Sequence, residues 1–168
     1  MSHGERGGSP QLRREEAEEA ARVLGSSLHA MPFPDTLLAV AQMVPVIESE
    51  IAAFKPDVVA TMSVHDSHQD HRAVHEATVA ATRDFVGTVL AYMTPSAAER
   101  FRPNWFVPLS ADVFATKLTA LECHRSQRAR VYLSAAYLEA TGRYWAMVTR
   151  SSAPYVEPFE LLRHKDAQ

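Results

Sequence analysis

Residues 58–62, VVATM, are the feature that most constrains how this sequence can fold. The run is short, apolar and nearly continuous, and helical patterns lie on both sides of it. Such a run is typical of a strand that is buried on both faces, as in a parallel sheet. A chain that alternates such strands with helices folds as an α/β sandwich around a mostly parallel sheet. In these folds the functional site lies beyond the carboxyl ends of the strands.

Helical and strand patterns alternate along the rest of the chain. Ser9 and Pro10 predict the start of the first helix and Gly25 predicts its end. Pro45 predicts either a kink in the second helix or the start of its second part. The predicted helices cover residues 10–24, 36–54, about 70–83, 111–127 and about 130–149. The predicted strands cover residues 27–33, 58–62, 84–93, 104–109 and 155–162. No repeat or shift in composition divides the sequence, so we expect a single domain over residues 1–168.

Composition argues against several classes of partner. The chain is 46% hydrophobic and 22% charged with a net charge of −3, so nucleic acid and anionic membranes have no electrostatic attraction for it. No apolar run approaches the ~20 residues that a membrane span requires. The lone cysteine, Cys123, excludes an internal disulfide and is typical of the reducing cytoplasm. We expect a cytoplasmic protein in which this cysteine packs within a helix.

Half of the eight histidines fall in residues 63–78, SVHDSHQDHRAVHEAT, directly after the predicted buried strand. The histidines and their acidic neighbours are His65, Asp66, His68, Asp70, His71 and His75. Imidazole and carboxylate groups are zinc ligands, and a catalytic zinc takes three protein groups with one position open for water. The residues alone leave two interpretations open. The cluster either contributes ligands to a metal, or it caps a helix and faces solvent.

The stretch HDSHQDHRAVHEAT resembles the second signature of the LmbE-like, or PIG-L, family of zinc-dependent N-deacetylases. That signature reads His-x-Asp-His and corresponds here to residues 68–71. Other family-like pieces follow in the same order and spacing: SHGERGG (2–8), Arg13, Glu16, Leu24-Gly25, Pro34-Asp35, KPDVV (55–59), LECHRSQ (121–127) and YVEPFEL (155–161). The resemblance covers essentially the whole chain and implies a Rossmann-like, mostly parallel sheet between helices.

The resemblance also implies roles for individual residues. His71 would be a zinc ligand, and His68 would hydrogen-bond or protonate the reacting amide. Asp70 would orient a histidine, which is the usual task of a carboxylate behind a metal ligand. Arg13 and Asp35 match positions that contact the sugar in family members.

Two further residues are weaker candidates for the substrate pocket. His124 lies in a motif that recurs in the family, although a histidine there would also suit a helix C-terminus. Glu5 would line the pocket by resemblance, but a loop glutamate near a chain end is ordinarily solvated.

The implied reaction is hydrolysis of an N-acetyl amide on an N-acetylglucosamine-type conjugate. Zinc lowers the pKa of its bound water and polarises the acyl oxygen. A carboxylate takes the proton of the water, and a histidine stabilises the tetrahedral intermediate and helps the amine leave. The expected partner is therefore a small-molecule sugar conjugate. Sugar-inositols, thiol precursors, glycopeptides and antibiotic intermediates all fit the pattern.

The sequence departs from the family pattern at its beginning. Family members start with an apolar strand that ends in Pro-His-Pro-Asp-Asp, which supplies two zinc ligands and the general base. No such motif occurs in this sequence. We expect the domain over 1–168 to lack the family's first strand, with Met1 an internal methionine of a longer coding sequence. A genuine fragment or a decayed relative is the alternative.

Three hypotheses follow from this departure. The first is the zinc-dependent N-deacetylase, and the second is a catalytically inactive module that binds a sugar conjugate or stabilises a partner. The third is a self-contained metal site of His65, His68, His71 and His75. A sheet without its first strand exposes an unpaired edge, so we also expect low stability or self-association as a homo-oligomer.

Overall fold

The computed structural model describes residues 9–31, 33 and 36–166 of the chain. Contacts within the chain group it into two compact units. The first unit comprises residues 1–35 and 106–157, and the second comprises residues 36–105 and 158–168. The expectation of a single domain over residues 1–168 stays a prediction.

The first unit is mainly helical. Its elements are α1 (Pro10–Val23), α4 (Ala111–Glu122), the short 3₁₀ helices η2 (Arg125–Gln127) and η3 (Val131–Leu133), α5 (Ala135–Val148), most of β3 (Trp105–Leu109) and the start of β4 (Tyr155–Lys165). Helix α1 begins where the sequence predicts, because the Ser9 side chain accepts a hydrogen bond from the Leu12 amide at 3.5 Å. It ends at Val23, two residues before Gly25, whose φ of +64° is a conformation that favours glycine.

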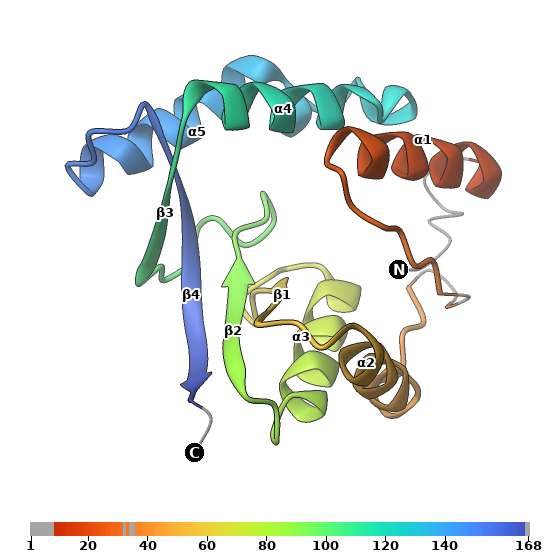
Figure 1. Ribbon diagram of the computed structural model, residues 1–168. Coiled ribbons are helices and arrows are strands. Elements are labelled where there is room, and N and C mark those ends of the chain that lie inside the picture. The colour runs from red at the N-terminus through yellow and green to blue at the C-terminus, as the bar shows by residue number, and fades with distance from the viewer. Residues whose placement is uncertain (1–8, 32, 34–35, 167–168) are drawn as a thin grey trace. The chain divides into compact units, whose positions relative to one another are not determined.

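Helices α1 and α4 pack against each other through small side chains (Figure 1). Ala20, Ala120 and Cys123 form a buried cluster there, with Val23 at its margin. The small residues let the two helix backbones approach closely. Cys123 is buried, as predicted.

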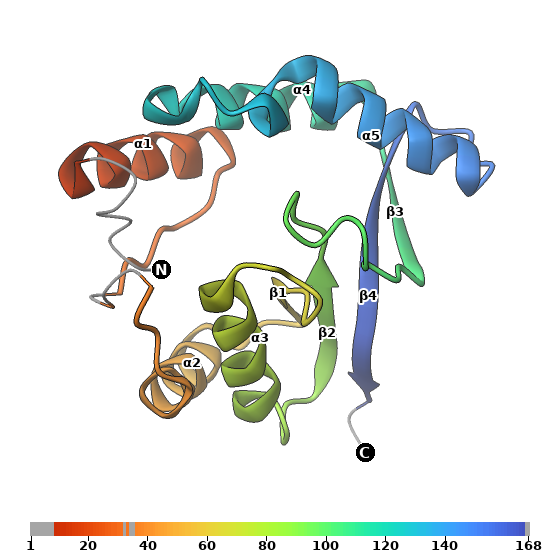
Figure 2. The same ribbon diagram turned by 180° about the vertical axis from the view of Figure 1, so that it is seen from behind.

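The second unit holds the parallel part of the sheet. Its elements are α2 (Val40–Phe54), β1 (Val58–Met62), α3 (Gln69–Ala81), β2 (Gly87–Tyr92) and the greater part of β4. Strands β1 and β2 are parallel with Val58 opposite Thr88, and β2 is antiparallel to β4. Helix α3 packs on β1, and α2 packs on α3 (Figure 2). The turn from β1 into α3 therefore places the histidine-rich stretch beyond the carboxyl end of β1.

The strands are hydrogen-bonded in the order β1-β2-β4-β3, and the α/β class is confirmed. The sheet is mixed, because β4 runs antiparallel to β2. Strand β1 has the predicted limits but is not buried on both faces. Among its residues only Thr61 is buried, and Val58 remains 51% exposed. Among the described residues β1 lies at the edge of the sheet, and its exposed residues, Val58 and Ala60, alternate with less exposed ones.

Three other predictions differ from the structure. The expected strand over 27–33 is wrong, since its described residues form no strand beyond an isolated bridge at Phe33. Helix α2 begins at Val40 and continues through Pro45. Helix α5 begins only after Ser134, whose side chain accepts from the Tyr137 amide at 3.3 Å and so caps it there. None of the described helices combines the length and the apolar character needed to cross a membrane.

The exposed edge of β1 generates a prediction about association. Replacing Val58 by lysine should reduce self-association of the purified chain, because a charge on an edge strand opposes pairing with a second strand. Sedimentation velocity over a concentration series measures the effect. Val79→Lys, on the exposed face of α3, is the matched control. A wild-type chain that stays monomeric at every concentration would contradict the prediction.

Candidate functional site

The turn between β1 and α3 is built around His68, the residue that caps α3. The His68 Nδ1 atom accepts a hydrogen bond from the Asp70 amide at 3.2 Å, and His68 has extended backbone angles. A polar side chain that accepts from the second helical amide is the standard way to start a helix. This cap places His71 in the first turn of α3, next to the end of β1.

His71 is bound by a buried carboxylate. Its Nδ1 atom lies 2.7 Å from Asp66 Oδ2, and the Asp66 side chain is fully buried. An ionised carboxylate at this position assigns the imidazole proton to Nδ1. The Nε2 lone pair is then available as an acceptor, which is the arrangement of a carboxylate–histidine–metal site.

Asp66 is held in its ionised form by hydrogen bonds. Burial alone would raise the pKa of this carboxyl group. Hydrogen bonds from the Thr94 hydroxyl, the His68 amide at 2.8 Å and His71 outweigh burial and lower the pKa to about 2. Asp66 is therefore an anion at neutral pH, and its charge also raises the pKa of Tyr92, in which burial is the larger cause.

The carboxylate bonded to His71 is Asp66, and the orienting role that the family resemblance implies for Asp70 stays a prediction. The buried Asp70 accepts a hydrogen bond from the Thr36 amide at 2.7 Å through Oδ2. That bond ties the segment before α2 to the first turn of α3. The turn brings the Asp66 carboxylate onto the ring of the residue five positions later.

The structure brings some of the clustered histidines together and separates others. The rings of His68 and His71 stack with their centroids 4.6 Å apart. His75 is buried, and its Nδ1 atom lies 2.8 Å from the Met62 carbonyl oxygen, where it ties α3 to β1. His65 is exposed. No group of three or more His, Cys, Asp or Glu side chains within the described residues could hold a metal ion. The self-contained four-histidine site is therefore wrong.

The remaining candidates lie in the first unit or outside the described residues. Arg13 is half-buried on α1, and His124 is half-buried just before η2. The expectations for Glu5 and Asp35 fall outside the described residues. Arg13 and His124 thus belong to one unit, whereas His68, Asp70 and His71 belong to the other.

A second buried carboxylate orders the segment next to His124. Glu16 is 1% exposed and accepts hydrogen bonds from the Ser126 amide at 2.7 Å and the Ser126 hydroxyl at 2.6 Å. Burial raises the pKa of Glu16, but these bonds and the nearby His124 and Arg125 charges give a net lowering. Residues 124–127 are consequently fixed against α1.

Sequence reasoning missed the two residues that organise these sites. Asp66 was noted among the histidines without a role, and Thr94, from the segment after β2, was not identified at all. In the sequence, the position of Asp66 beside the histidines is the one feature that indicates a role for it. Nothing in the sequence near Thr94 distinguishes its hydroxyl from others.

Comparison with known proteins adds independent information. The profile of the PIG-L family, described as GlcNAc-PI de-N-acetylase, matches residues 1–82. The uncharacterized deacetylase YaiS of Escherichia coli K12 is 35% identical over 123 residues, which are 68% of this chain and 65% of that protein. The chain thus spans just under two thirds of the length of this relative.

Two solved structures share the fold. The N,N'-diacetylchitobiose deacetylase of Pyrococcus horikoshii is 22% identical with a TM-score of 0.76, over 96% of this chain and 70% of that one. The 4-carboxy-2-hydroxymuconate hydratase GalB of Pseudomonas putida KT2440 is 20% identical with a TM-score of 0.78, over 95% of this chain and 73% of that one. In its histidine motif and in these matches, the chain is similar to LmbE-like proteins of the PIG-L family.

The buried anion at residue 66 generates a prediction about acid stability. Folding lowers the pKa of Asp66 from 3.8 to about 2, so the unfolded chain binds the proton more readily. Asp66 therefore contributes about 2 kcal/mol to the free energy of unfolding. This contribution is complete above about pH 5 and is lost as the pH falls through the pKa of the folded state. Urea unfolding should therefore show that the free energy of unfolding of the wild type falls between pH 7 and pH 3. Asp66→Asn should lack the part of this fall that comes from residue 66.

The matched control is Asp84→Asn, at a side chain that is 94% exposed. This variant should keep the wild-type pH dependence of the free energy of unfolding. Equal pH dependence in wild type and Asp66→Asn would contradict the role given to the buried carboxylate.

Proposed function

We propose that this chain acts as a metal-dependent N-deacetylase that hydrolyses the N-acetyl amide of an N-acetylglucosamine-type conjugate. The observation that carries the proposal is the hydrogen bond between buried Asp66 and His71, which leaves Nε2 of His71 available as a metal ligand. The PIG-L family description and the deacetylase names of the relatives support the same reaction class.

The metal that we propose is Zn²⁺, and the donor chemistry of His71 fits it. A neutral imidazole nitrogen with a carboxylate behind it is a typical zinc ligand. The described residues hold this ligand but do not form a set of three. When bound, zinc supplies an activated water and polarises the acyl oxygen.

The hydrogen bond that His68 accepts supports a role for this residue as a hydrogen-bond donor. Its Nδ1 atom accepts from the Asp70 amide, so a neutral His68 carries its proton on Nε2. His68 also stacks on His71, which places this N–H donor beside the proposed ligand. A donor at that position can hydrogen-bond the acyl group and the leaving amine nitrogen. Asp70 would act indirectly, by fixing the first turn of α3.

The sugar would be bound by Arg13, Asp35, His124 and Glu5, as the family resemblance implies. The order that Glu16 imposes on residues 124–127 supports His124 in this set, because a fixed loop presents its side chains without an entropic cost at binding. Cytoplasmic location and the homo-oligomer stay predictions of the same proposal.

The competing function is a binding module without hydrolytic activity. The fold alone does not choose between reactions, since GalB, a hydratase, shares it. The two functions differ in an observable way, because a module would bind an N-acetyl sugar without releasing acetate.

Acetate release tests the proposal. The purified chain is incubated with Zn²⁺ and either N,N'-diacetylchitobiose or N-acetylglucosaminyl-inositol, and zinc content is measured in parallel. His71→Ala should lower both stoichiometric zinc and acetate release, the latter by about 100-fold, as expected for loss of a metal ligand or its orienting group.

The control is His65→Ala, at an exposed histidine of the same turn, which should keep both properties. Zinc and sugar binding without acetate release would favour the binding module. Zinc content that is unchanged in His71→Ala would overturn the site itself.

A further inference from the structure

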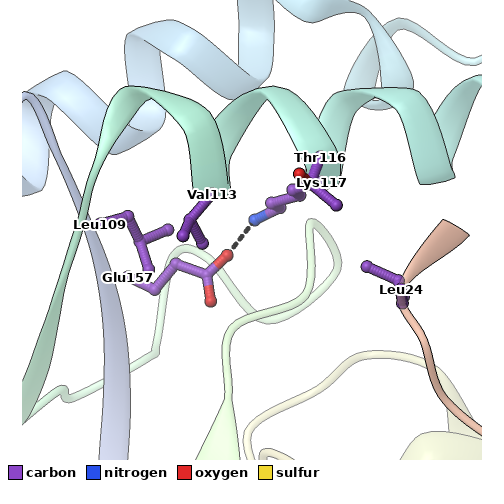
Figure 3. A pocket seen from close by; sticks show the side chains of 6 residues that line it. All are labelled: Leu24, Leu109, Val113, Thr116, Lys117 and Glu157. Carbon is purple, nitrogen blue, oxygen red and sulfur yellow. Dashed lines mark hydrogen bonds and ion pairs between the residues drawn. The ribbon is translucent and has the colours of Figure 1, made fainter.

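The first unit contains a recess that no part of the proposed catalysis uses (Figure 3). It is an open recess of about 460 Å³ bordered by the end of α1, the end of β3, one side of α4 and the start of β4. Its lining residues are Leu24, Leu109, Val113, Thr116, Lys117 and Glu157. All of them belong to the first unit, so the recess can be considered without reference to the turn that carries His71.

An ion pair lies among three aliphatic side chains and Thr116 in the lining. Lys117 Nζ donates to Glu157 Oε1, and the two side chains are only 35% and 31% exposed. Figure 3 shows both charged groups directed toward the space that Leu24, Leu109 and Val113 border. A lysine ammonium has three donors and a carboxylate has two acceptor oxygens. The pair therefore uses only part of its hydrogen-bonding capacity on itself, among the described residues.

The chemistry of this lining defines a class of ligand. A donor and an acceptor lie side by side with no net charge, and aliphatic side chains adjoin them. A carboxylate ligand would meet the negative Glu157, and an ammonium ligand would meet the positive Lys117. An amide satisfies both partners, because its carbonyl accepts from Lys117 while its N–H donates to Glu157.

We propose that this recess binds an uncharged amphiphile, a short apolar chain that ends in an amide-type group. The chain contacts Leu24, Leu109 and Val113, and the amide bridges Lys117 and Glu157. The proposal is independent of the deacetylase function, since it involves neither His71 nor Asp66.

A series of four small probes tests the proposed chemistry: hexanamide, hexanoate, hexylamine and acetamide. Each is titrated into the full chain labelled at the leucine and valine methyl groups, and NMR chemical shifts of Leu24, Leu109 and Val113 are recorded. Hexanamide should bind about tenfold more tightly than each of the other three, which corresponds to about 1.4 kcal/mol. Absence of shifts with hexanamide, or equal binding of hexanamide and hexanoate, would overturn the proposal.

Two variants test whether the ion pair sets this preference. Glu157→Gln leaves Lys117 without its carboxylate and should reverse the preference toward hexanoate. Lys117→Met should reverse it toward hexylamine. The matched control is Glu18→Gln, which removes the carboxylate of the exposed Arg14–Glu18 pair on α1 and should leave the order of affinities unchanged. A preference that survives in both recess variants would show that the pair plays no part in recognition.

Discussion

Asp66 is the residue on which the candidate site depends, because a buried carboxylate without partners would be costly. Its oxygens accept from a backbone amide, a hydroxyl and an imidazole, and these bonds make the buried charge tolerable. The same bonds fix the N-terminus of α3, the segment after β2 and the ring of His71. Removing the carboxylate would release the ligand and its supporting turn together.

Other buried carboxylates in both units also accept hydrogen bonds from backbone amides. Glu16 accepts from the Ser126 amide, Asp70 from the Thr36 amide and Glu160 from the Arg102 amide. Each of these acids is buried, and each binds the backbone N–H of a residue outside the α-helices and strands. Charge-assisted bonds of this kind are stronger than bonds between neutral groups. They explain how segments without regular structure hold side chains in fixed positions in a chain whose fully buried apolar residues are mostly small.

The sequence predicts the elements that carry the site more successfully than the interactions within it. The limits of β1 and the helix after His68 follow from a short apolar run and a cap, which are local signals. The burial of β1 was predicted wrongly because sheet order depends on partners distant in sequence. The role of Asp66 was missed for the same reason, since its bond to Thr94 joins residues 28 positions apart. The strand expected at 27–33 has an apolar pattern, but its described residues form only an isolated bridge at Phe33.

The protonation state of His71 tests the account most directly. Nitrogen-15 NMR of the imidazole should show the proton on Nδ1 in the wild type and a displaced Nε2 resonance once Zn²⁺ is added. In Asp66→Asn the ring should lose its single tautomer, because the asparagine amide no longer dictates the position of the proton. A wild-type ring with its proton on Nε2, whose resonances zinc leaves unchanged, would contradict the assignment of His71 as a metal ligand.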